Sequence, residues 1–221
     1  MSEKRSYGDS CGIARALDLV GERWALLVVR ELIHGPKRFT DLRAGLPSVS
    51  ADMLAQRLRD LETGGIVSRR TLPPPAAARV YELTEWGSAL EPVLLALGRF
   101  GSRAPLSDEP PPLSVDAAVM MLQTTYRRPA GAPARYALVI DQQPFELEAG
   151  GECLRVRRGE ARDPVATFET DTATLVSVLF HGQAPADAIA ADRLRLAGDR
   201  AGAERLLETF AAPVPVGAAH A

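Results

Sequence analysis

Apolar residues in the first half of the chain recur every three or four positions, in segments that glycine or proline closes. Four such segments are present: Ile13–Val20, Trp24–Leu32, Phe39–Leu46 and Leu54–Leu61. This spacing is typical of helices with one buried face, because one helical turn takes 3.6 residues. We therefore expect four helices here, the last of them capped by Ser48 or Ser50.

Strand-like segments follow the fourth predicted helix. Residues 66–72 and 79–83 flank three prolines, Pro73–Pro75, and are interpreted as a β-hairpin with its tip at the prolines. Thr84 can then begin a fifth helix, whose apolar side consists of Leu90, Leu94, Leu97 and Phe100. Four helices, a hairpin and a helix, in this order, are typical of a winged helix-turn-helix domain.

The second half mixes helical and strand-like periods. Apolar residues from Val115 to Tyr126 have helical spacing, whereas Tyr136, Leu138 and Ile140 alternate with their neighbours as in a strand with one buried face. Further strands, and helices from Asp171 onward, complete a predicted α+β domain with an antiparallel or mixed sheet. We expect a winged helix-turn-helix domain over residues 8–105, a Pro-rich linker over 106–113, and the α+β domain over 114–211.

Length and charge agree with this division. A chain of 221 residues is long enough for two domains. Through Pro105 it has 15 Lys and Arg against 12 Asp and Glu, and after Pro105 it has 11 against 16. The basic first half is compatible with binding to nucleic acid, and the acidic second half disfavours contact with phosphate.

Other classes of protein find little support. The three histidines, His34, His181 and His220, are far apart, and the chain has no HExxH, GxSxG, P-loop or GxGxxG motif. We therefore expect no enzyme, no metal site and no cofactor. The two cysteines suggest no disulfide framework, and no apolar run is long enough for a signal or a membrane span. A cytoplasmic protein without a membrane partner is predicted.

The fourth predicted helix and the hairpin are the candidates for contact with DNA. Opposite its leucines the helix presents Gln56 and Arg59, with Met53 and Arg57 on the flanks. Glutamine can pair with adenine and arginine with guanine in the major groove. An ordinary surface helix is the alternative for this segment alone, and the arginines of the hairpin favour DNA. The predicted contact residues are Ser48, Ser50, Met53, Gln56, Arg57, Arg59, Arg69, Arg70 and Arg79.

An ordered series of motifs resembles the HxlR-type regulators over about residues 8 to 103. It comprises Cys11–Ile13, Leu17–Trp24, Leu32–Leu42, Leu58–Val67 and Tyr81–Gly87. The resemblance implies a homodimeric winged-helix protein that binds a pseudo-palindromic site on double-stranded DNA. It also implies that the first and last helices form the dimer interface, with Leu90, Leu94, Leu97 and Phe100 against the partner.

One position departs from that family. Its usual pattern has proline after the N-terminal cysteine, whereas here Gly12 follows Cys11. Some relatives use this cysteine as a redox or electrophile sensor, which requires an exposed thiol with a lowered pKa. Arg15, one turn further on, could supply the positive charge. The alternative is a small structural cysteine.

Short motifs in the second half are similar to the sterol-carrier-protein-2 fold. They are Asp163–Asp171, Leu194–Asp199 and Leu206–Leu207, within a match over about residues 114 to 211. The resemblance implies an apolar cavity for a small-molecule effector, and a solid core is the alternative. The candidate lining residues are Val119, Leu122, Tyr126, Leu138, Phe168 and Leu179.

The leading hypothesis is a homodimeric transcriptional regulator whose affinity for DNA is controlled by an apolar small molecule in the second domain. Two alternatives remain open. One is a regulator that senses oxidants or electrophiles through Cys11. The other is a carrier of hydrophobic ligands that does not bind DNA.

Overall fold

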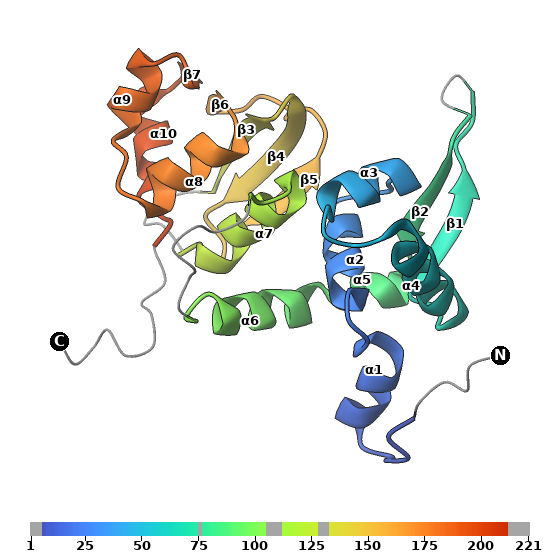
Figure 1. Ribbon diagram of the computed structural model, residues 1–221. Helices are drawn as coiled ribbons and strands as arrows, with labels where there is room; N and C mark the ends of the chain where they lie inside the picture. Colours follow the sequence, from blue (N-terminus) through green and yellow to red (C-terminus); the bar gives the residue numbers. More distant parts are fainter. Residues whose placement is uncertain (1–5, 75–76, 105–111, 128–132, 212–221) are drawn as a thin grey trace, which may run out of the picture. The chain divides into compact units, whose positions relative to one another are not determined.

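A computed structural model describes residues 6–74, 77–104, 112–127 and 133–211 (Figure 1). The chain divides into two compact units, Met1–Leu94 and Leu95–Ala221. The winged-helix elements lie in the first unit, apart from the end of the last helix, which crosses the division. Each unit has its own buried apolar residues.

The first unit has the element order expected from the periodicity, with one difference. Its elements are α1 (Gly12–Val20), α2 (Ala25–Leu32), α3 (Phe39–Gly45), α4 (Ala51–Thr63), β1 (Val67–Thr71), β2 (Arg79–Leu83), α5 (Glu85–Ser88) and the start of α6 (Glu91–Gly101). The single fifth helix that we predicted is thus two helices. Pro92 explains the break, because its ring nitrogen cannot donate a hydrogen bond to the preceding turn.

Local capping sets the ends of α4 and α5. The Ser50 hydroxyl accepts a hydrogen bond from the Met53 backbone N–H at 3.2 Å, so Ser50 is the cap of α4. At the other end, Gly65 takes a φ of +71°, which glycine adopts without steric cost. The Thr84 hydroxyl accepts from the Gly87 N–H and donates to the Gly65 carbonyl oxygen at 2.7 Å. Thr84 therefore holds the start of α5 to the end of α4.

The hairpin pairs β1 with β2 antiparallel, with Val67 opposite Leu83 and Thr71 opposite Arg79. Two described residues of the hairpin are buried: Val67 at its base and Val80, opposite Arg70 and closer to the tip, are each 2 % exposed. The rest extends beyond the helices of its unit (Figure 1). It therefore has the form of a wing.

The second unit is a mixed sheet with helices, as the predicted α+β class requires. Its elements after α6 are α7 (Val115–Thr125), β3 (Ala134–Ile140), β4 (Gln143–Ala149), β5 (Arg155–Arg158), β6 (Ala166–Thr170), α8 (Thr172–Phe180), α9 (Pro185–Ala190), β7 (Leu194–Gly198) and α10 (Arg200–Leu207). The strand order is β5-β4-β3-β6-β7, in which β3 and β6 are parallel and the other pairs antiparallel. The Asp171 carboxylate caps α8 by accepting from the Thr174 N–H at 2.7 Å.

The candidate lining residues of the second unit lie in its core. Val119, Leu122, Tyr126, Leu138 and Phe168 are at most 9 % exposed and belong to one packed apolar cluster. Leu179 is half-buried and packs against the same cluster. These six side chains therefore belong to, or pack against, the apolar core of the second unit.

Candidate nucleic-acid interface

Helix α4 has two chemically different faces. Leu54, Leu58 and Leu61 are at most 1 % exposed and hold the helix on the core of its unit. The opposite face is open to solvent, with exposed side chains at positions one turn apart. It carries Asp52, Met53, Gln56, Arg59 and Thr63.

Hydrogen bonds join two polar side chains of this open face to each other and to Asp60 beside it. Arg59 donates from Nη2 to Oε1 of Gln56 at 2.6 Å, and Gln56 donates from Nε2 to Oδ1 of Asp60 at 2.8 Å. Arg59 itself is exposed. The face therefore offers a guanidinium that its own helix already holds in place.

Arg57 does not join this open face. Its side chain is 11 % exposed, and Nη1 lies 3.3 Å from Oδ2 of Asp60 and 3.7 Å from Oε2 of Glu22, in the turn after α1. Its Nε is buried and has no hydrogen-bond partner among the described residues. The sequence suggested that Arg57 meets a base, whereas the structure directs it towards the turn after α1.

The serines before α4 differ in their environment. The Ser50 hydroxyl is engaged as the helix cap, and Ser48 is exposed two residues earlier. The first turn of α4 leaves backbone N–H groups without partners inside the helix, which is a favourable place for a phosphate. Asp52 in that turn opposes a close phosphate.

The wing carries the three predicted arginines, which differ in their carboxylate partners. Arg69 Nη2 lies 3.3 Å from Oε2 of Glu62, and Arg70 Nε lies 2.7 Å from Oε2 of Glu82. Both side chains are nearly half exposed. Arg79 is exposed, and the structure gives it no carboxylate partner within the described ranges. Arg79 therefore offers the least neutralised charge of the three.

A buried ion cluster that sequence reasoning missed joins the wing to the helices. Glu31 on α2 is fully buried, with Arg30 Nη2 2.9 Å from Oε1 and Lys37 Nζ 2.7 Å from Oε2. The Lys37 backbone forms two hydrogen bonds with Tyr81 of β2, at 2.9 and 2.8 Å. A glutamate in a helix is ordinarily expected on the surface, so the sequence did not indicate that Glu31 is buried. No local motif marks its partners.

Apolar side chains stand exposed on α1 and α6. Leu97 and Phe100, predicted for the dimer interface, are 49 % and 79 % exposed, whereas Leu94 is 7 % exposed and Leu90 is half-buried. Further exposed apolar residues, absent from the predicted interface, lie on these helices. They are Ile13, Leu17 and Val93.

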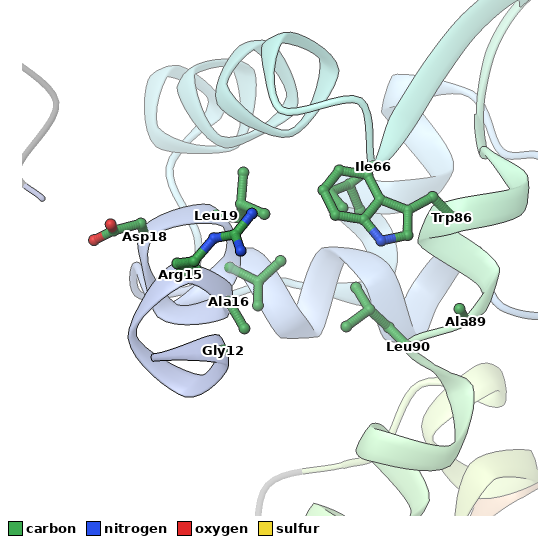
Figure 2. Close-up of a pocket in the computed structure, with 10 residues that line it drawn as sticks. Gly12, Arg15, Ala16, Asp18, Leu19, Ile66, Trp86, Ala89 and Leu90 are labelled. Atoms are coloured by element: carbon green, nitrogen blue, oxygen red, sulfur yellow. The ribbon is translucent and has the colours of Figure 1, made fainter. Parts of the chain in front are cut away.

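An open hollow of about 640 Å³ lies beside α1 (Figure 2). Figure 2 shows Arg15, Ala16 and Leu19 of α1 on one side and Trp86 and Leu90 on the other. Trp86 is 57 % exposed, so much of this lining is apolar surface in contact with solvent.

Cys11 immediately precedes α1 and is exposed. The backbone N–H groups of Ile13 and Ala14 at the start of the helix lower the pKa of the Cys11 thiol. This cause differs from the Arg15 side chain that the sequence suggested. An exposed thiol with a lowered pKa has more of the reactive thiolate at neutral pH.

In the second unit, an apolar hollow lies at the edge of the sheet. It measures about 290 Å³ and lies among α9, β7 and α10, with a lining that includes Ile189, Leu194, Leu196 and Leu207. Arg200 and Glu204 also line it and form an ion pair at 3.1 Å. None of the six predicted lining residues is among those around this hollow.

The described residues include no group of three or more His, Cys, Asp or Glu side chains that could hold a metal ion. Within the same ranges, no helix has the length and apolar character needed to cross a membrane. His34 is buried near the end of α2.

Comparison with known proteins locates similarity in the first half of the chain. The model of the HxlR-like helix-turn-helix family matches residues 19–107. The uncharacterized HTH-type transcriptional regulator YvaP of Bacillus subtilis is 35 % identical over 88 residues, which are 40 % of this chain and 82 % of YvaP. The HTH-type transcriptional regulator YodB of the same organism is 44 % identical over 78 residues, which are 35 % of this chain and 70 % of YodB.

Solved structures give matches of similar extent. The reduced form of YodB from B. subtilis has 36 % sequence identity and a TM-score of 0.39, covering 43 % of this chain and 94 % of that chain. The redox regulator HypR in its oxidized form has 35 % identity and a TM-score of 0.40, covering 44 % of this chain and 100 % of that chain.

Proposed function

Because this chain belongs to the HxlR-like helix-turn-helix family, we propose that it regulates transcription by binding operator DNA as a homodimer. The observation that carries the proposal is α4 itself. It is a capped helix with a leucine face in the core and a face with Met53, Gln56 and Arg59 open to solvent, next to an arginine-bearing wing. A helix of this kind fits the major groove.

The wing supplies contacts that do not depend on base sequence. Arg69 and Arg70 are paired with carboxylates on the surface, and such exposed pairs contribute only about 0–1 kcal/mol, so phosphate can compete for them. Arg79 has no carboxylate partner within the described ranges, so it breaks no such pair when it binds phosphate. Contacts to phosphate position the protein on the duplex, and Arg79 is the strongest candidate for one.

Dimerisation is supported by the exposed apolar residues of α1 and α6. Ile13 and Phe100 are each more than 70 % exposed, which is unfavourable in water unless another surface covers them. A second copy of the chain is the occupant that the family membership favours. A two-fold dimer would address two half-sites about 34–36 Å apart.

DNA binding is tested by titrating the DNA upstream of the protein's own gene at several salt concentrations. We expect two chains per site and a steep loss of affinity as salt rises, because phosphate contacts release counterions. Arg79→Ala should weaken binding to all sequences to a similar degree and lower the salt slope by about 1. Arg135→Ala, the same change on an exposed strand residue of the second unit, is the control.

Two results would contradict this proposal. One is the absence of salt-dependent affinity for any duplex. The other is an Arg79→Ala effect that is confined to particular base sequences, since this would make Arg79 a base contact.

We further propose that the second unit responds to an apolar small molecule. The hollow among α9, β7 and α10 supports this, because its lining is mainly apolar and it is accessible from outside. We expect native mass spectrometry of the gently purified protein to detect a bound apolar molecule, which Leu196→Arg should remove. Retention of the molecule by that variant would rule out this hollow as its site.

A redox-controlled regulator is the second candidate, and the lowered pKa of Cys11 is the observation that favours it. The thiolate fraction of Cys11 should rise at lower pH than that of an unfolded peptide with the same flanking residues. We therefore expect the iodoacetamide reaction of Cys11 to have its pH midpoint below that of the peptide. If Cys11→Ser still releases DNA under oxidant, this candidate function is excluded.

A further inference from the structure

A continuous series of polar side chains runs across α4 from its buried side to its open face. Arg57 lies 3.3 Å from Oδ2 of Asp60, whose other oxygen, Oδ1, accepts from Gln56 at 2.8 Å. Gln56 in turn accepts from Arg59 at 2.6 Å. Each member therefore restrains the next, and Arg59 stands at the exposed end.

The middle of this series bears on how α4 could read DNA. A glutamine that recognises adenine must use its carbonyl oxygen and its amide N–H together. In Gln56 the carbonyl oxygen is directed to Arg59, three residues later, and Nε2 is directed to Asp60, four residues later. Recognition of adenine by Gln56 would therefore disturb both contacts.

Unlike Gln56, Arg59 could recognise a base without giving up its contact within α4. A guanidinium has five N–H donors, and only the bond from Nη2 to Gln56 is seen within the described part of the chain. The remaining donors can form the pair of parallel hydrogen bonds that recognises O6 and N7 of guanine. A guanidinium already held by a neighbour loses less side-chain freedom when it binds.

The anchoring of Asp60 completes the argument. Arg57 is 11 % exposed, so it holds the Asp60 carboxylate from the protected side of the helix. Asp60 can then orient the Gln56 amide by a charge-assisted hydrogen bond. The order of the series thus assigns a supporting role to Asp60 and Gln56.

We propose that Arg59 is the side chain through which α4 reads a guanine, and that Gln56, held by Asp60, is a positioning residue for the Arg59 guanidinium. This deepens the proposed function and rests on it, since α4 must enter the major groove. It also replaces the direct pairing of Gln56 with adenine that the sequence suggested.

The experiment measures binding to a selected half-site and to all of its single base-pair substitutions. The variants are Gln56→Ala, Arg59→Lys and the double variant. Arg59→Lys keeps the charge but loses the planar fork, so it should reduce preference for one G·C pair by about 10- to 100-fold while the salt slope stays unchanged. Gln56→Ala should weaken preference at that same base pair, and the double variant should show little further loss.

Two further variants separate positioning from general damage. Asp60→Asn keeps an oxygen that can accept from Gln56, so it should retain more of the guanine preference than Asp60→Ala. Thr63→Ala lies on the same exposed face, and its preference should match that of the unchanged protein. Thermal unfolding of each variant shows whether the fold has changed.

The outcomes distinguish the two levels of the proposal. Relaxed preference at a different base pair in Gln56→Ala would make Gln56 a base reader and overturn the inference. Effects of Gln56→Ala and Arg59→Lys that multiply in the double variant would also overturn it. If the unchanged protein shows no salt-dependent binding to DNA, the proposed function fails, and the inference fails with it.

Discussion

Replacement of Lys37 by methionine is expected to lower the free energy of unfolding of the first unit by about 1–3 kcal/mol. Lys37 Nζ lies 2.7 Å from Oε2 of Glu31, whose side chain is fully buried. Methionine fills a similar volume but leaves that carboxylate oxygen without its cation. Arg30 still pairs with the Glu31 carboxylate, but a buried oxygen that loses a hydrogen-bond donor cannot replace it with water, which is costly.

Tryptophan fluorescence during urea unfolding measures this effect in the full chain. The chain has two tryptophans, Trp24 and Trp86, and both lie in the first unit, so the signal reports on that unit alone. The matched control is Lys37→Met combined with Glu31→Leu, which removes both members of the pair. It should recover much of the lost stability, because replacing a buried pair by apolar groups is often close to neutral.

A loss below about 1 kcal/mol in Lys37→Met would contradict this prediction, because the groups that remain around Glu31, Arg30 among them, would then satisfy its carboxylate without Lys37. We also expect the cluster to affect DNA binding indirectly, because the Lys37 backbone is hydrogen-bonded to Tyr81 in the wing. At a temperature where the variant is folded, its affinity for DNA should change more than that of a control such as Arg135→Ala.

Leu58→Ala is expected to cost about 2–5 kcal/mol of stability. Leu58 is 1 % exposed and lies on the core face of α4, so truncation removes apolar contacts and leaves a cavity. Arg59→Ala, one residue later on the exposed face, should stay within about 0.5 kcal/mol of the unchanged protein. The same fluorescence titration compares the two variants.

The base preference in DNA binding should distinguish Leu58→Ala from Arg59→Ala in the opposite way to stability. At low temperature, where Leu58→Ala is mostly folded, it should keep the base preference of the unchanged protein. Arg59→Ala should lose that preference with its stability intact. If both variants were equally unstable, the assignment of two distinct faces to α4 would be wrong.

Much of the winged domain was predictable, because its signals are local. The leucines of α4, the Ser50 cap and Gly65 lie within one continuous segment and set a helix with one buried face. Thr84 likewise marked the start of α5 correctly. The split between α5 and α6 was missed, although Pro92 provides a local signal for it.

The candidate site was only partly predictable. Gln56 and Arg59 were placed on the open face by helical geometry, and the structure confirms their exposure. Arg57 could not be placed in this way, because its environment depends on Glu22, which lies 35 positions earlier. In the second unit, alternation identified inward-facing side chains, but whether they line a cavity or fill a core depends on how the layers pack.

By itself, the sequence determined the order of the elements in the first unit apart from the break between α5 and α6, the buried leucine face of α4, and the family of the first half. These follow from interactions within a few residues: periodic burial, capping and the absence of an N–H in proline. Only the tertiary structure decided that Glu31 is a buried ion linked to the wing through Lys37, and that Arg57 faces the turn after α1. The strength of a charge pair depends on distance and burial in space, which spacing along the chain does not specify.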